Sequence, residues 1–120
     1  MEYKKKESVS GEFAKKGKDV SDGDTLTIKN GGTQVEGQFG TQNIFLVETK
    51  NGDKLLSVNQ TSINALVDKY GGESNGWINK QVVVHVVKQN VAGKFIPVYY
   101  VAPEGYVLGE NGFELDGSQP

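Results

Sequence analysis

The chain has 120 residues, of which 36% are hydrophobic and 23% charged, and this composition suits a single soluble domain. It contains no cysteine, which excludes disulfides, thiolate chemistry and any zinc site built on cysteine. The single histidine and the carboxylates are then the only side chains left that could bind a metal. We therefore expect neither a metal nor another cofactor.

The charges are placed unevenly. All 13 basic residues are lysines and they face 15 acids, so the formal net charge of −2 does not mark a nucleic-acid binder. Residues 1–18 hold six lysines and three glutamates, whereas residues 103–120 hold four acids and no lysine. No apolar run is long enough for a membrane span, and no signal-peptide pattern follows the lysines at 4–6. We expect a cytoplasmic protein that does not contact a membrane.

Short alternating runs in the first half predict antiparallel strands. The first strand covers residues 25–29, bends at Asn30, Gly31 and Gly32, and continues over residues 33–36 beyond a glycine bulge. A loop of residues 37–43 follows. Next comes a hairpin of residues 44–49 and 54–58 around Asn51-Gly52, because both turn residues accept the positive φ of a type I′ turn.

One segment has helical periodicity. Apolar residues recur at i, i+3, i+4 and i+7 over residues 61–70, which predicts an amphipathic helix. Thr61 or Ser62 can cap its start and Gly71 its end. Trp77, just beyond, is expected to pack beneath the helix as a plug.

The second half predicts two more strands and a tail. Residues 81–88 form a valine-rich central strand around a half-buried His85, and a turn at 90–94 leads to residues 95–101. Pro97 cannot donate to a ladder, which places this last strand at a sheet edge or at a bulge. From residue 103 the chain is glycine-rich and acidic, without expected packing of its own.

Three strands, a helix and two strands is the element order of the OB-fold, an all-β, five-stranded Greek-key barrel with its helix between strands 3 and 4. We therefore expect a flexible basic segment over residues 1–18, an OB-fold domain over 19–102 and an acidic, glycine-rich tail over 103–120.

Three short motifs carry a family resemblance. They are residues 59–66 followed by Tyr70-Gly71, residues 77–80, and residues 86–91 followed by Gly93-Lys94. In these motifs the chain resembles a group of small OB-fold proteins from viruses and archaea that bind single-stranded DNA or assist replication. The resemblance covers about the middle two thirds of the chain. It implies binding rather than catalysis, and for a viral protein it implies the host cytoplasm.

Catalysis has little support in the sequence. His85 lies among valines on a predicted strand, and a general base there would need a cleft that nothing else marks. The run from Gly11 to Lys18 has the wrong glycine spacing for a phosphate loop, and Asp19 stands where Ser or Thr should follow the lysine. We expect no enzyme.

Nucleic-acid binding has better material. The ligand groove of an OB-fold crosses strands 2 and 3 and is bordered by two loops, which here are residues 37–43 and 89–94. Phe39 could stack on a base for about 1–3 kcal/mol or could cap the barrel, and the sequence leaves both open. Phe45 becomes a stacking platform if Ile44 and Leu46 face the core, which is also open. On the last strand we expect Tyr99 to be exposed.

Lysines and amides complete the candidate groove. The absence of arginine predicts weak sequence preference, since the planar fork that reads guanine is missing. The candidate nucleic-acid-binding residues are Lys29, Gln38, Phe39, Phe45, Lys50, Lys54, Lys88, Asn90, Lys94 and Tyr99.

The sequence thus predicts a module that binds single-stranded nucleic acid with little sequence specificity, during replication, repair or recombination; DNA is the expected ligand, and RNA is left open. Its acidic tail could recruit a replication protein, although the chain ends in Gln119-Pro120 and lacks the terminal Pro-Phe of bacterial single-strand-binding proteins. The alternative is an OB-fold module for protein interaction or assembly that binds no nucleic acid.

Overall fold

The computed structural model describes residues 11–37, 40–109 and 112–115. It is mostly β, with one α-helix. In chain order the elements are β1 (Thr25–Ile28), β2 (Thr33–Gly37), β3 (Gly40–Thr49), β4 (Gly52–Val58), α1 (Gln60–Tyr70), the 3-10 helix η1 (Ser74–Trp77), β5 (Gln81–Val91), β6 (Lys94–Pro103), β7 (Tyr106–Gly109) and β8 (Gly112–Leu115). Within the described residues, neither helix has the length and hydrophobicity to cross a bilayer.

β1 and β2 act as one bent strand, as the glycine bulge predicts. Both pair antiparallel with β3, on the side opposite β4. The amide oxygen of Asn30 fixes the bend by accepting hydrogen bonds from the N–H groups of Gly32 (3.0 Å) and Leu46 (3.0 Å). Gly32 has φ +84° and lies against the Phe45 ring, where a Cβ would come within 2.6 Å. Only glycine fits this position without displacing the ring.

The sheet does not close into the expected barrel. Its path runs from β4 through β3, β1 and β5 to β6, and no ladder of the described residues joins β4 to β6. Side chains at the start of α1 occupy the edge of β6 instead: Val101 N–H donates to Ser62 Oγ (2.9 Å), and Asn59 Nδ2 donates to the Tyr99 carbonyl (3.3 Å). Two outward backbone groups of β6, the Val101 N–H and the Tyr99 carbonyl, are thereby satisfied without a neighbouring strand.

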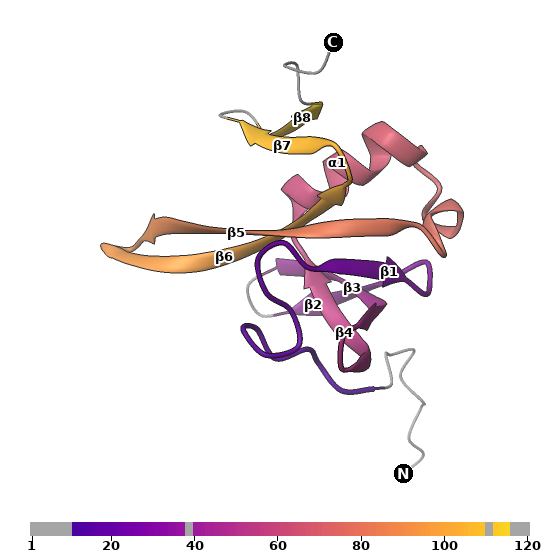
Figure 1. The fold of residues 1–120 in the computed structure, drawn as a ribbon, viewed down its shortest axis with the longest axis horizontal. Coiled ribbons are helices and arrows are strands. Elements are labelled where there is room, and N and C mark those ends of the chain that lie inside the picture. Colours follow the sequence, from indigo (N-terminus) through magenta and orange to yellow (C-terminus); the bar gives the residue numbers. More distant parts are fainter. Residues whose placement is uncertain (1–10, 38–39, 110–111, 116–120) are drawn as a thin grey trace.

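Residues 11–20, here called the strap, pack against the free edge of β4 (Figure 1). Leu55 N–H donates to the Glu12 carbonyl (2.9 Å) and Ala14 N–H donates to the Leu55 carbonyl (2.8 Å). Val20 is buried in the main core. Residues 11–18, expected to belong to a flexible segment, are thus held to the body.

The main core lies between the sheet and α1. Trp77 fills it as the predicted plug: its ring stacks on Phe45 at 5.8 Å between centroids, and its Nε1 donates to the Gly71 carbonyl (2.8 Å). The remaining buried members of the core are Val20, Leu26, Ile28, Val47, Leu56, Val58, Leu66, Val82, Val84 and Val101.

α1 matches the predicted helix except at its N-cap. Asn59, rather than Thr61 or Ser62, accepts the hydrogen bond of the Ser62 N–H through its side-chain oxygen (3.0 Å). Ser62 is instead buried against β6. The predicted Gly71 ends the helix with φ +93°.

The β3–β4 turn differs by one residue from the predicted Asn51-Gly52 turn. Thr49 lies opposite Gly52, so Lys50 and Asn51 form the turn, and Gly52 takes the positive φ (103°). The predicted type I′ turn is therefore wrong. Asn51 is held by Thr49 Oγ1, which accepts from the Asn51 N–H (3.0 Å).

The predicted loop at 37–43 is also shorter than expected. Residues 40–43 belong to β3, where they pair with β2.

The acidic C-terminal region contains a hairpin of its own. β7 and β8 pair antiparallel, and Tyr106 and Phe113 pack with Ala65 and Ala102 in a second small cluster. Burial, with a hydrogen bond from the Tyr106 hydroxyl to Asp68 (2.7 Å), raises the pKa of Tyr106 to about 12. Residues 106–109 and 112–115 are therefore packed structure, contrary to the expectation for this tail.

Candidate functional site

The β5–β6 ribbon extends beyond the body of the molecule. The two strands pair from Val82 opposite Pro103 to Val91 opposite Lys94. Ala92 and Gly93 connect them with φ angles of 53° and 85°, as a type I′ turn requires. The predicted loop at 89–94 is thus mostly strand. We call the projecting residues 86–99 the arm (Figure 1).

One face of the arm combines aromatic rings with lysine and amide groups. Residues directly opposite in an antiparallel pair point to the same side, so Lys88 and Pro97 share this face with Asn90 and Phe95. Phe95 is 73% exposed. Tyr99 lies two residues beyond Pro97 on the same face and is half-buried. We call these five residues the aromatic face.

The strap supplies positive charge at the inner end of this face. Lys16 Nζ lies 5.4 Å from the centroid of the Tyr99 ring, within the range of a cation–π contact. Lys15 and Lys18, on the same strap, are exposed. Tyr99 packs against the main core on its other side, so its ring is held in place.

The arm itself is purely cationic. Residues 86–99 hold two lysines, Lys88 and Lys94, and no acid. Phe95 and Tyr99 are four residues apart on one strand, which separates them by about 13 Å, and Lys88 faces Pro97 between them. Such a surface offers rings to flat, uncharged groups and ammonium groups to anions.

Phe45, predicted as a stacking platform, lies in the core. It is 4% exposed and stacks on Trp77, so no base can reach it without opening the core. The alternation was ambiguous because Ile44, on the other face of β3, is buried too. Inward residues of a strand are normally identified because the opposite face is polar. Here both faces are covered, so the polar face is missing.

Lys54, predicted to border the groove, points inward opposite Val47 and bonds to the strap. Its Nζ lies 2.7 Å from Glu12 Oε1. This contact lowers the pKa of Glu12 and raises the pKa of Lys54. The Lys54 ammonium therefore helps to fix the strap to β4.

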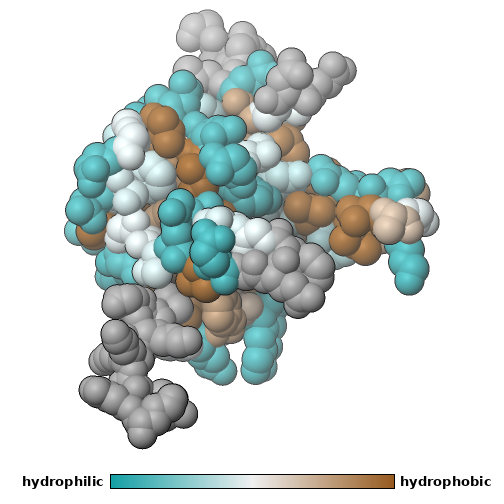
Figure 2. Space-filling model, turned by 180° about the vertical axis from the view of Figure 1, so that it is seen from behind, coloured by the Kyte–Doolittle hydropathy of each residue, from teal (hydrophilic) through white to brown (hydrophobic). Residues whose placement is uncertain are grey.

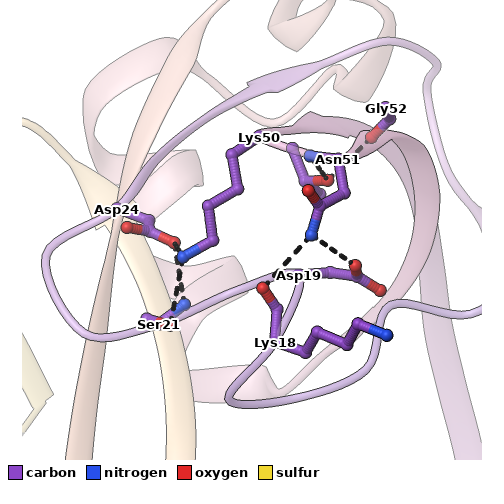
Figure 3. A network of polar contacts seen from close by, with 8 residues as sticks. Lys18, Asp19, Ser21, Asp24, Lys50, Asn51 and Gly52 are labelled. Atoms are coloured by element: carbon purple, nitrogen blue, oxygen red, sulfur yellow. Dashed lines mark hydrogen bonds and ion pairs between the residues drawn. The ribbon is translucent and has the colours of Figure 1, made fainter.

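Lys50 is likewise engaged in a polar network with the chain between the strap and β1 (Figure 3). Its Nζ lies 3.2 Å from Asp24 Oδ2 and donates to Ser21 Oγ (3.3 Å). Beside it, Asn51 Nδ2 donates to Asp19 Oδ1 (2.9 Å). Asp19 also accepts from the Lys15 N–H (2.8 Å), and these two hydrogen bonds lower its pKa. The network holds the strap against the β3–β4 turn.

The other predicted residues divide between the arm and elsewhere. Lys29 is exposed just after β1, where its N–H donates to the Leu46 carbonyl (2.8 Å), and Gln38 and Phe39 lie outside the described residues. The arm brings together the remaining four, Lys88, Asn90, Lys94 and Tyr99, although Lys94 lies on its opposite face.

Two residues of this site were missed by the sequence analysis. Phe95 was treated as the first residue of a strand, although the spacing Phe95-x-Pro97-x-Tyr99 places both rings on one face. Lys16 was assigned to a flexible segment, and no local pattern indicates that the strap returns to β6.

A hollow between the β1–β2 bend and α1 is a weaker candidate. It has a volume of about 240 Å³ and is lined by Gln34, Asn43, Ile63 and Ser74 together with Phe45 and Trp77. Gln34 Nε2 donates to Asn43 Oδ1 (3.1 Å), and the two rings are buried against each other. The hollow therefore offers a base neither a free ring nor an uncommitted amide pair.

His85 lies on β5. It is half-buried, as predicted, with its ring 5.2 Å from that of Phe113. Among the described residues, no three His, Cys, Asp or Glu side chains gather as a metal site would require.

Comparison with known proteins gives no family. No protein-family model matches the chain, and no curated protein matches it significantly.

Proposed function

We propose that the protein binds single-stranded nucleic acid, with DNA as the preferred ligand, along the aromatic face of the arm. The observation that carries the proposal is the exposed Phe95 ring on one face with Lys88 and Tyr99. Bases would stack on Phe95, while Lys88 and Lys16, which lies over the Tyr99 ring, would bind phosphates.

The chemistry favours a single strand over a duplex. An aromatic ring contacts the flat side of a base, and in a duplex both sides are already stacked. The arm has no arginine with which to read guanine, so the surface suits many sequences. Replication, repair and recombination all expose single strands of arbitrary sequence, and a role in one of them is part of the proposal.

We also propose that the body is an OB-fold with an open seam. The element order supports this, as does the pairing of one bent strand, β1–β2, with both β3 and β5. In place of a β4–β6 ladder, the strap lies along β4 and α1 caps β6. The arm then corresponds to the loop between strands 4 and 5, one of the two that border an OB ligand groove.

Fluorescence anisotropy with a labelled single-stranded DNA of about 20 nucleotides, somewhat longer than one OB-fold covers, tests the proposal. Phe95→Ala is expected to weaken binding by about fivefold or more, since stacking contributes about 1–3 kcal/mol per base. Lys88→Gln is expected to make the log–log salt slope less negative by about 0.7.

The matched controls lie away from the arm. Phe13→Ala removes an aromatic residue that is also exposed, and Lys29→Gln removes an exposed lysine near the bulge. Both are expected to bind DNA like the wild type. An absence of binding at low salt, or equal affinities for Phe95→Ala and Phe13→Ala, would overturn the proposal and favour a protein-interaction module. RNA of the same length, run in parallel, establishes the preferred sugar.

A further inference from the structure

The strap connects the two strands that no ladder joins. On one side it is anchored to β4, where Leu55 forms two backbone hydrogen bonds with the strap and Lys54 pairs with Glu12 (2.7 Å). On its other side it meets β6, where Lys16 Nζ lies over the Tyr99 ring. The strap thus bridges the open seam between β4 and β6.

The strap folds into a closed turn around Lys16. The Lys15 carbonyl accepts from the Asp19 N–H (2.8 Å), and Asp19 Oδ2 accepts in return from the Lys15 N–H (2.8 Å). Gly17 N–H donates to the Val20 carbonyl (2.8 Å), and Val20 is buried in the main core. The turn and its buried neighbour therefore hold the Lys16 backbone in place while the strap is docked.

The strap supplies more lysines beside the aromatic face than the arm does. It holds three exposed lysines within four residues, Lys15, Lys16 and Lys18. Among the described residues, the ion pairs involve Lys50 and Lys54 rather than these three. Hydrophobic residues gather along the projecting arm (Figure 2), which has only two lysines. A polyanion on the aromatic face would therefore gain much of its electrostatic attraction from the strap.

We propose that docking of the strap and binding of nucleic acid are coupled through Lys16. This coupling rests on the proposed function, because it needs a strand bound along the aromatic face. On the docked strap the Lys16 ammonium lies over the Tyr99 ring, which is about 13 Å from Phe95 along β6. A strand that stacks on Phe95 and follows this face then reaches Lys16 with a phosphate.

Docking affects binding because it holds Lys16 next to Tyr99. A phosphate that meets an ammonium group already in place binds without further ordering of the backbone. When the strap is detached, the same contact first requires the strap to be ordered, so the strand binds less tightly. Coupling between two sites is reciprocal, and the bound strand therefore favours the docked strap by the same factor.

Hydrogen exchange of the Ala14 amide tests the coupling, because this N–H donates to Leu55 and is released when the strap detaches. A saturating single-stranded DNA of about 20 nucleotides is expected to slow the exchange. The expected factor is about fivefold or more, the lower end of typical couplings between two sites. Lys16→Gln is expected to bind DNA through Phe95, more weakly, and to show no slowing when it is saturated.

Glu12→Gln separates an anchor of the strap from the residue that couples it to the ligand. It removes the ion pair with Lys54, so the Ala14 amide is expected to exchange faster without DNA. DNA should still slow the exchange by about the wild-type factor, because the Lys16 contact is intact. If Lys16 served only the structure of the strap, Lys16→Gln would show this same pattern, and that result would overturn the inference.

Lys29→Gln is the matched control, because Lys29 is an exposed lysine outside the strap. It is expected to keep the wild-type slowing, and a loss equal to that of Lys16→Gln would contradict the inference. Anisotropy of the same samples measures binding separately. DNA that binds without slowing the Ala14 exchange would overturn the coupling alone, whereas DNA that does not bind at low salt would overturn the proposed function as well.

Discussion

The inner and outer halves of the β5–β6 ribbon are built from similar residues but have opposite environments. Val84, in the inner half, is 1% exposed and belongs to the main core, whereas Val91, near the tip, is 46% exposed. Both are valines on one continuous strand. The difference arises because α1, the strap and the β7–β8 hairpin surround only the inner half. Strand character and burial are thus separate properties. The exposed strand residues, unlike the buried ones, are available to contact a ligand.

A similar contrast separates Gly32, at the β1–β2 bend in the body, from Gly93, at the tip of the arm. Gly32 and Gly93 have nearly equal φ angles, +84° and +85°. A Cβ on Gly32 would come within 2.6 Å of the Phe45 ring, whereas one on Gly93 would meet nothing within 4 Å. Tertiary packing therefore constrains one glycine far more than the other.

The largest expected effect is the loss of stability on replacing one of these glycines with alanine. Gly32→Ala should cost about 3 kcal/mol, from the left-handed backbone and the clash with a ring that Trp77 holds in place. Gly93→Ala should cost about 1 kcal/mol, from the backbone alone. Urea unfolding of both variants measures the difference. Equal losses would mean that the Phe45 ring moves aside freely.

A second pair compares the two halves of β5 directly. Val84→Ala should cost about 2–3 kcal/mol, because it removes two buried methyl groups and leaves a cavity. Val91→Ala should change stability by less than about 0.5 kcal/mol. Denaturant unfolding of both variants provides the measurement. A large loss for Val91→Ala would show that the arm is already covered within one chain.

The smallest expected effect concerns the strap. Because the pKa of Glu12 is lowered in the folded protein, its contribution to stability is present above its ordinary value of 4.5 and is lost as the pH falls through the folded value. The strap should then detach on acidification, and exchange of the Ala14 amide hydrogen, which is bonded to Leu55, should become faster. Glu12→Gln should weaken this pH dependence and leave the part that Asp19 contributes. If exchange of the Ala14 amide depended on pH in the same way in the wild type and in Glu12→Gln, contacts other than the Glu12–Lys54 pair would hold the strap.

Local pattern predicted most of the elements. The alternating runs, the glycine bulge, the amphipathic helix and the plugging Trp77 all follow from short-range periodicity and turn chemistry. The errors lie where distant parts meet. Asn59 replaces Ser62 as the N-cap because Ser62 is needed at β6, and Ala92 takes a positive φ that its residue type does not suggest.

The candidate site was predicted in part for the same reason. Lys88, Asn90 and Tyr99 lie close together along one ribbon, so local alternation sufficed to group them. Lys50, Lys54 and Phe45 lie apart from this ribbon, and their environments depend on the strap and Trp77, which are remote in sequence. Lys16 lies in the site because the strap, which is remote in sequence, returns to β6 and brings Lys16 over the Tyr99 ring.

Composition and periodicity therefore established a β-rich chain with one helix, an edge strand at Pro97 and a cysteine-free chemistry. These are properties of residues and their near neighbours. The open seam, the projecting arm and the choice of exposed rings depend on which segments cover which faces. That choice follows from the sum of many long-range contacts, and no single stretch of sequence records it.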